Sequence, residues 1–454
     1  MTDWHASNVS RLFPNGLPRF SERLGLPLQL YTPFFADNFQ TPYNMTESTV
    51  FKGTKIVVPA QSYAFFSDLF DLGLQQTGDR MRAYEVDFLD SNFEGSPSMF
   101  ETVHSASQWY AGMAQAALER GIAIQYCLCS VSDILESLTL PAVVQARASG
   151  DYVGPIDNPL ALGGSSLLMG ALHIAPSKDT LWTSSPQPGT MSDTEHDGLS
   201  YTTQPHVALD AVLATLSLGP VGISDGLGQA DAGLISQAFR SANDSTLLRP
   251  SRPLSWVDSS LINRTFGGAF ADVRSTHAAV RATAASAGAP LRNSHYVLGW
   301  RTPSDVALGA TDLFPPPADP AAPLAARLHA LAPGAAQGGC VEGAPAAACV
   351  TVVSYGEALV LPASGTALGN FTLMAVYEPL ESGAWFLGEL AKFVHVSPQR
   401  FEYVAVGGSG ASGVAVGVRG SQGESVLLTS VDAKGVVHVQ SVAIPEGGFV
   451  EAQL

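Results

Sequence analysis

The sequence is poor in charged residues and in cysteine, and it contains no long apolar run. Charged residues make up 14% of its 454 residues and hydrophobic residues 46%, a balance that excludes an intrinsically disordered chain. No run of about 18 or more apolar residues occurs, so no membrane span is expected. The 23 basic residues are outnumbered by 40 acidic ones, and the net charge of -17 argues against nucleic acid or an anionic membrane surface as a partner.

Only four cysteines are present. Cys127 and Cys129 lie in the β-like run 122–129, where side chains two residues apart share one face. A metal site is not expected there, because no second pair with zinc-ligand spacing follows. Cys340 and Cys349 bracket a loop rich in Gly, Ala and Pro, and either form a disulfide or stay free. We expect no metal and no cofactor.

Signals for the cellular compartment conflict. The first residues lack the basic start and the apolar stretch of a signal peptide. Five Asn-X-Ser/Thr sites favour a secretory route, at Asn8, Asn44, Asn243, Asn263 and Asn370. We therefore expect an extracellular, lysosomal or vacuolar protein if the N-terminus is truncated, and a cytoplasmic protein otherwise.

Strand-like and helix-like segments alternate from residue 1 to about residue 250. The expected strands are 26–31, 83–88, 122–129, 142–147, 180–184 and 221–224. The expected helices are 62–74, 106–120, 132–138, 165–173, 208–216 and 232–240. This alternation predicts parallel β/α units. The pattern does not choose between a barrel and an open doubly wound sheet, although no Gly-x-Gly-x-x-Gly loop follows the first strand. The six strands are two fewer than a closed barrel needs.

The character of the chain changes after about residue 255. Residues 302–349 are rich in Ala, Pro and Gly and are expected to form a loop or insertion. Short strand-like runs then dominate, at 349–353, 371–377, 401–406, 425–429 and 436–442, which is typical of an antiparallel sandwich. The sequence therefore predicts two domains, a β/α domain over 1–258 and an all-β sandwich over 259–454.

Two acidic residues stand where a barrel would place reacting groups, at the carboxyl ends of strands. Asp87 lies near the end of the strand 83–88, and Asp151 follows the strand 142–147. A pair of carboxylates is the minimum for glycoside hydrolysis, one as nucleophile and one as acid and base. Either residue is equally compatible with an ordinary loop acid or a helix N-cap.

The candidate substrate-binding residues are Tyr31, Glu85, Arg147, Asp179, Trp182 and Asp225. Asp225 is as compatible with a turn cap, Asp179 with an ion pair to Lys178, and Trp182 with the core.

The order of these segments resembles the barrel of glycoside hydrolase family 36, especially its raffinose synthase-like branch. Tyr84-Glu-Val-Asp87 is similar to the Lys-x-Asp nucleophile strand, and Arg147-Ala-Ser-Gly-Asp-Tyr152 to Arg-x-Ser-Asp-Asp-Phe, whose second Asp is the acid/base. Gly219-Pro-Val-Gly-Ile-Ser-Asp225 resembles the eighth strand of that family. The other similar segments are 13–17, 24–31, 165–168, 176–179 and 247–253.

The resemblance spans roughly residues 12–258 and implies a (β/α)8 TIM-type barrel. It implies a retaining mechanism at an α-linked sugar, such as an α-galactoside, through a glycosyl-Asp87 intermediate and without a metal. Glu85 replaces the usual Lys, and Gly150 replaces the first Asp of the acid pair. By this resemblance, we expect the first one or two β/α units of the barrel to be missing from the chain as given. A truncated sequence, a partner chain that completes the barrel, or a different packing of the first 25 residues would each explain this.

Three functions remain open at this stage. The first is an α-glycosidase or transglycosidase with a carbohydrate substrate. The second is a catalytically degenerate carbohydrate-binding protein on the same fold, favoured by Glu85, Gly150 and the absent strands. The third is a β/α enzyme of unrelated chemistry, because a fold alone does not fix function.

Overall fold

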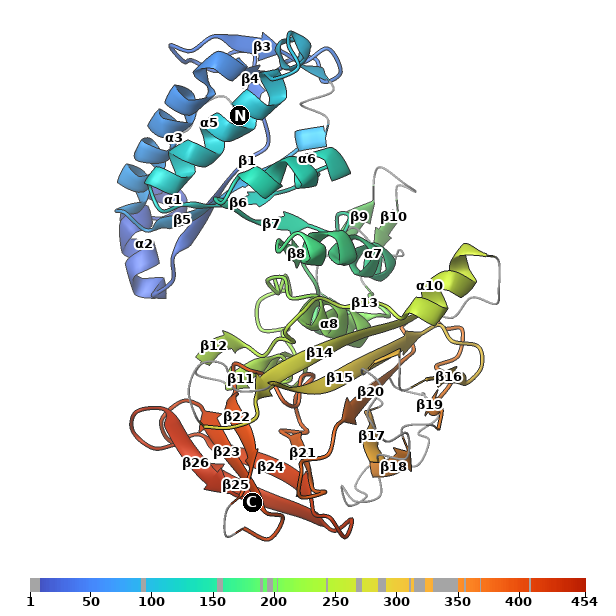
Figure 1. Ribbon diagram of the computed structural model, residues 1–454. Coiled ribbons are helices and arrows are strands. Elements are labelled where there is room, and N and C mark those ends of the chain that lie inside the picture. The colour runs from blue at the N-terminus through green and yellow to red at the C-terminus, as the bar shows by residue number, and fades with distance from the viewer. Residues whose placement is uncertain are drawn as a thin grey trace. The chain divides into compact units, whose positions relative to one another are not determined.

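The structure is a computed structural model that divides into two compact units (Figure 1). Unit 1 comprises 1–150 and 168–176, and unit 2 comprises 151–167 and 177–454. The domain boundary expected at residue 258 stays a prediction. The structure describes residues 9–90, 95–152, 158–187, 191–193, 199–201, 203–241, 244–266, 272–284, 291–309, 312–313, 323–329, 350–354, 357–367, 369–407 and 410–454.

A five-stranded sheet forms the centre of unit 1. Its order is β1 (Leu28–Thr32), β5 (Met81–Val86), β6 (Ala123–Tyr126), β7 (Val143–Arg147) and β8 (Ala175–Ser177). The pairs β1–β5, β5–β6 and β6–β7 are parallel. The spatial order therefore follows the chain order, without the reversal that creates the switch point of a doubly wound sheet.

Helices cover one face of this sheet. The helices α3 (Ser62–Thr77) and α5 (Ser105–Glu119) pack side by side there (Figure 1). Phe70 of α3 packs edge-on against Tyr84 of β5, and Tyr110 of α5 contacts Tyr126 of β6. All four of these aromatic side chains are buried. Burial of this aromatic layer contributes to the apolar stabilisation of unit 1.

The connection from β1 to α3 carries a small antiparallel sheet that the sequence did not predict. Its order is β2 (Phe35–Ala36), β4 (Thr54–Val57) and β3 (Met45–Glu47). Two helices precede β1, namely α1 (Val9–Leu12) and α2 (Gly16–Leu24). The helix α6 (Val131–Glu136) follows β6 and begins at a capping box, in which Ser130 is the N-cap and Asp133 its partner.

The first part of unit 2 is built from short elements. A parallel bridge joins Leu181 to Ile223, at the two segments where the sequence predicts strands. The elements of this region are β9 (Met191–Asp193), β10 (Leu199–Tyr201), α8 (Val207–Leu216), α9 (Ala232–Ser236), β11 (Phe239–Ser241), β12 (Asp244–Leu247), β13 (Ser255–Trp256) and α10 (Asp258–Thr265). The helix α7 (Asn158–Ala171) lies before β8 in the chain.

A large, mostly antiparallel sheet forms the rest of unit 2. Its order is β18 (Val350–Ser354), β17 (Pro323–His329), β20 (Phe371–Tyr377), β15 (Leu291–Trp300), β14 (Asp272–Arg281), β22 (Phe401–Val406), β23 (Val414–Arg419) and β26 (Phe449–Gln453), with β13 beside β14. Only the β14–β22 contact is a parallel pairing among those described in this sheet.

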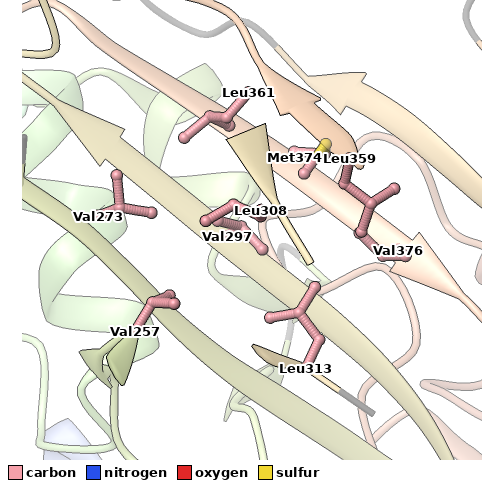
Figure 2. Packing of buried hydrophobic residues seen from close by; sticks show 9 residues of the cluster. All are labelled: Val257, Val273, Val297, Leu308, Leu313, Leu359, Leu361, Met374 and Val376. Atoms are coloured by element: carbon pink, nitrogen blue, oxygen red, sulfur yellow. The ribbon is translucent and has the colours of Figure 1, made fainter. Parts of the chain in front are cut away.

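Both faces of this large sheet are covered. On one face, Val273, Val297 and Met374 pack against the small sheet of β16 (Val306–Leu308) and β19 (Leu359–Leu361) (Figure 2). On the other, the N–H of Val396 donates to the hydroxyl oxygen of buried Tyr296 at 2.9 Å. A three-stranded sheet of β21 (Trp385–Gly388), β24 (Ser425–Val431) and β25 (Val437–Ala443) completes the unit.

The sequence thus predicted the α/β character of the first half and the antiparallel strands of the second. The parallel sheet of unit 1 confirms the β/α units, whereas closure into a barrel stays a prediction. The strands β16 and β17 lie within the span 302–349, where a loop or insertion was expected. Cys340 and Cys349 lie outside the described residues. Within the described part of the chain, no helix combines the length and the apolar character needed to cross a membrane.

Candidate active site

Asp87 stands directly after β5, at the carboxyl edge of the unit 1 sheet. Its N–H donates to the Thr32 carbonyl (3.1 Å), and the Cys127 N–H donates to the Val86 carbonyl (2.9 Å). These bonds extend the parallel ladder by one residue at the centre of the sheet. The strands β1, β5 and β6 therefore bring their last residues to one level.

Two donors hold the carboxylate of Asp87. The Tyr31 hydroxyl donates to Oδ2 at 2.8 Å, and the N–H of Phe88 donates to Oδ1 at 2.7 Å. The side chain is only 6% exposed. A buried carboxylate that accepts bonds on both oxygens has a fixed plane.

The face of the sheet opposite the helices is polar. Each of the first four strands places one polar side chain on this face at its end and another two residues earlier, because alternate residues share a face. We call this set the polar face; it consists of Gln29, Tyr31, Glu85, Asp87, Gln125, Cys127, Gln145 and Arg147. It contains four of the residues that the sequence singled out for the site.

Hydrogen bonds link the inner row of the polar face. The Gln29 side-chain amide donates to Glu85 Oε2 (2.8 Å) and to Gln125 Oε1 (3.1 Å), and Gln145 donates to the same Gln125 oxygen. This row orients the Glu85 carboxylate, which lies two residues before Asp87 on the same strand. The polar face is therefore a connected network across four strands.

Burial shifts the proton affinities of this network. It raises the pKa of the Glu85 carboxyl, while hydrogen bonds from Gln29 and Cys127 oppose the shift. Burial likewise raises the pKa of the Cys127 thiol; Arg147 opposes this, and Asp87 adds to it. The pKa of Tyr31 is raised by burial and then by its bond to Asp87. The phenol and the thiol therefore stay protonated at neutral pH and act as donors.

The remaining predicted site residues belong to unit 2. Asp151 is exposed and follows β7 by four residues, while Trp182 is buried and packs edge-on against Tyr152, with ring centroids 6.1 Å apart. Asp179 Oδ2 accepts the N–H of Tyr152 at 2.9 Å. Asp179 thus fixes the backbone directly after Asp151.

Asp225 connects two loops of unit 2. Its carboxylate accepts bonds from the Thr183 N–H (2.9 Å), the Thr183 hydroxyl (2.6 Å) and the Gln187 side-chain amide (2.6 Å). These donors follow the Leu181–Ile223 bridge directly. The carboxylate therefore organises the loops at this end of the bridge.

A buried pair of opposite charges near Tyr152 was not predicted. The Lys178 ammonium donates to the Thr180 carbonyl at 2.5 Å and lies 4.2 Å from the centroid of the Tyr152 ring. Burial lowers the pKa of Lys178 and raises the pKa of Asp210, and each group opposes the shift of the other. In the described residues, neither carboxylate oxygen of Asp210 has a hydrogen-bond partner.

The predicted residues thus fall into two sets. Unit 1 brings together Tyr31, Glu85, Asp87 and Arg147 on one sheet face; unit 2 holds Asp151, Asp179, Trp182 and Asp225. Among the described residues, no group of three or more His, Cys, Asp or Glu side chains is arranged to hold a metal ion.

The glutamines of the polar face were missed, although the sequence carries a signal for them. The four strands contain Gln29-Leu-Tyr31, Glu85-Val-Asp87, Gln125-Tyr-Cys127 and Gln145-Ala-Arg147, each a polar residue two positions before another. In a parallel sheet with both faces buried in apolar side chains, such a pattern is not expected. Its recurrence in four successive strands would have identified the face.

Comparison with known proteins gives only distant similarity. No family model matches the chain, and no curated protein matches it. Solved structures of a glycoside hydrolase family 97 enzyme from Pseudoalteromonas sp. strain K8 are similar at 11% identity and a TM-score of 0.41; they include a complex with acarbose and a variant in complex with panose. Each alignment covers 80% of this chain and 48% of the other, so this chain spans about half the length of those structures.

Proposed function

We propose that this protein is a retaining glycoside hydrolase or transglycosidase acting on α-linked sugars. The observation that carries the proposal is the setting of Asp87: a buried carboxylate at the carboxyl end of a parallel strand, held on both oxygens by Tyr31 and Phe88. A nucleophilic carboxylate must be oriented before substrate arrives, and two donors fix its plane.

In the proposed mechanism, Asp87 attacks the anomeric carbon while Asp151 protonates the leaving oxygen. The resulting glycosyl-Asp87 ester is then cleaved by water, or by a sugar hydroxyl, after Asp151 takes its proton. This mechanism requires the two carboxylates to lie roughly 5 to 5.5 Å apart when substrate is bound. Asp151 is exposed, as a group that exchanges protons with a leaving alcohol and with water must be.

The unit 1 sheet supports a barrel-type catalytic domain as part of this proposal. Its strands follow chain order, its helices cover one face, and its other face carries a polar network. In a β/α barrel the helices lie outside, and the inner face of the strands leads to the active site at their carboxyl ends. Glu85, Arg147, Asp179, Trp182 and Asp225 are then proposed to contact or support the sugar.

The first test is turnover of 4-nitrophenyl α-galactoside by Asp87→Ala. Because removal of a nucleophile eliminates the covalent route, we expect turnover to fall at least about a thousandfold. Proton NMR of the first-formed sugar should show the α-anomer for the unmodified protein, the outcome of a retaining mechanism. Asp37→Asn, at an exposed aspartate of the same unit, serves as the control. Undiminished turnover by Asp87→Ala would exclude the nucleophile role.

A second candidate function is carbohydrate binding without turnover. Glu85 favours it, because an acidic group stands two residues from Asp87 on the same face, at the position where the family that the sequence resembles has a Lys. Calorimetry with galactose, raffinose and glucose distinguishes the two functions. Binding of a sugar by a protein that hydrolyses none of its glycosides would establish the second and exclude the first.

A further inference from the structure

Phe88, the residue after Asp87, has an unusual backbone conformation. Its φ is +56°, in the left-handed region that bulky aromatic residues rarely adopt. Leu128 has a φ of +44° at the corresponding place after β6, directly following Cys127. Strained residues of this kind persist only where their surroundings hold them, and they concentrate at functional sites. The positive φ of Phe88 therefore needs an explanation in the contacts of the peptide before this residue and of the ring and chain after it.

On one side, the peptide between Asp87 and Phe88 is turned toward the carboxylate. Its N–H donates to Asp87 Oδ1 at 2.7 Å, while the Asp87 N–H keeps its place in the ladder with the Thr32 carbonyl. The peptide plane therefore differs from the one that would continue the strand.

On the other side, the ring of Phe88 is anchored. It packs edge-on against Phe34, with centroids 5.4 Å apart, and against Phe51, with centroids 6.3 Å apart. Beyond it, Leu89 is buried, and the Asp90 N–H donates to the Leu128 carbonyl at 3.1 Å. Because the ring and the following chain are held in place, turning the preceding peptide toward Asp87 forces the φ of Phe88 to be positive.

Both anchoring rings come from the connection between β1 and α3, which carries β2, β3 and β4 (Figure 1). This connection contacts the loop after β5 a second time, since the N–H of Thr49 donates to the Gly95 carbonyl at 2.6 Å. A side chain at Gly95 would collide with Ser48, whose oxygen would lie 2.2 Å from the added carbon. The two segments are thus fitted together at two places.

We propose that Phe34, Phe51 and Phe88 form an aromatic clamp, a positioning device that keeps the N–H of Phe88 on the carboxylate of Asp87. With Tyr31 on Oδ2 and Phe88 on Oδ1, the clamp determines which lone pairs of Asp87 are left for a substrate. The consequence for catalysis rests on the proposed function. The geometry of the clamp is independent of the proposed function, because the Phe88 amide can be measured in a protein that turns over no substrate.

The sequence provides a direct probe of this peptide. The dipeptide Asp-Phe occurs once in the chain, at residues 87 and 88. Protein labelled with carbonyl-13C aspartate and 15N phenylalanine therefore gives one cross-peak in an HNCO spectrum, from the Phe88 amide. Hydrogen exchange and the proton shift of that peak report the bond to Asp87, with or without substrate.

We expect the Phe88 amide to exchange at least about tenfold faster in Phe51→Ala and in Phe34→Ala, with its proton resonance moved upfield. Phe100→Ala is the matched control, because Phe100 is 66% exposed and lies in the same unit. Thermal unfolding of each variant checks that it folds. If one variant fails to fold, the other still tests the clamp. Phe51→Ala is the milder change, because the Phe51 ring is already 37% exposed.

Kinetics with the aryl α-galactoside give a second readout. The clamp predicts a lower kcat in Phe51→Ala with little change in KM, and more activity in Phe88→Gly than in Phe88→Ala, because only glycine adopts the left-handed region freely. A purely structural role of the ring predicts the opposite order, since alanine retains more apolar contact.

The outcomes separate the two proposals. If the Phe88 amide behaves alike in all the variants, the clamp is wrong, whatever Asp87 does. If the amide is released in Phe51→Ala while the unmodified protein turns over no glycoside, the clamp stands and the glycosidase proposal fails.

Discussion

The two main sheets of this protein differ in where their polar side chains lie. The parallel sheet of unit 1 has one face covered by aromatic side chains of α3 and α5 and one polar face whose inner glutamines bond to one another. The large sheet of unit 2 is covered on both faces, and all seven residues of its strand β20 are buried. One charged pair of this sheet, Arg274 with Asp272, is buried as an ion pair.

This difference separates stability from function. A sheet buried on both faces gains apolar stabilisation from every residue, but it offers no surface for a substrate. A sheet with one polar face gives up part of that stabilisation and keeps side chains available for chemistry. We therefore expect substitutions in unit 2 to affect mainly unfolding, and substitutions on the polar face to affect mainly activity.

The largest effect on stability is expected for Arg400→Met in unit 2. The Arg400 side chain is fully buried and bonds to Glu389 (3.0 Å), Glu424 (2.6 Å) and the Arg419 carbonyl (2.8 Å). Its removal leaves two carboxylates without their main cation, so the free energy of unfolding should fall by about 3 to 5 kcal/mol in a urea titration. Arg419→Met, at a half-exposed arginine, should cost less than about 1 kcal/mol. Equal losses in the two variants would contradict this interpretation.

The next effect concerns pH and the facing histidines of β14 and β15. Burial lowers the pKa of His277 to about 4 and that of His295 to about 3, and the nearby Arg252 adds to both shifts. Below about pH 6.5 the unfolded chain binds protons that the folded chain does not. The free energy of unfolding therefore decreases as the pH is lowered, by up to about 1.4 kcal/mol per pH unit for each histidine.

The double variant His277→Gln/His295→Gln should therefore lose less stability than the unmodified protein between pH 7 and pH 5, measured by urea unfolding. At pH 7 and above the two histidines contribute nothing to the slope, because both states are neutral there. His104→Gln, at an exposed histidine, should leave the slope unchanged. A double variant with the slope of the unmodified protein would show that these histidines take up protons in the folded state.

The smallest effects on stability are expected for two tyrosine variants, one on each face of the unit 1 sheet. Tyr31 on the polar face donates to Asp87, whereas Tyr84 on the helix-covered face bonds to Thr32. Tyr84→Phe should lower the free energy of unfolding by about 1 kcal/mol and leave turnover unchanged. Tyr31→Phe should change stability by less than about 0.5 kcal/mol but reduce kcat several-fold. Urea unfolding and steady-state kinetics of both variants would show whether the two faces divide as proposed.

Much of the secondary structure followed from the sequence. The expected segments 62–74, 106–120 and 142–147 correspond to α3, α5 and β7, because their apolar spacing and their glycine ends are local signals. The small sheet between β1 and α3 did not follow, since strands of two to four residues carry too little pattern to detect. Closure of the barrel and the roles of the two aspartates stay predictions.

The candidate site was predictable in part. Asp87 was identified because it ends a strand, which is a property of the local sequence. Tyr31 was named for the sugar, but its bond to Asp87 joins residues 56 positions apart and depends on the register of β1 against β5. The buried residues Lys178 and Asp210 had no sequence signal, because an isolated charged residue usually faces solvent.

By itself, the sequence determined the main parallel strands and helices of unit 1, namely β1, β5, β6, β7, α3 and α5, and the acidic residue that follows β5. These are local properties, set by the spacing of apolar side chains and by helix caps. The sequence did not predict β8, and the expected helix 232–240 ends at Ser236 before β11. Only the tertiary structure decided that Tyr31 and the Phe88 amide hold Asp87, and that Phe34 and Phe51 hold Phe88. Such contacts depend on strand register and on the path of a long connection, and each is the sum of many weak interactions that no short segment specifies.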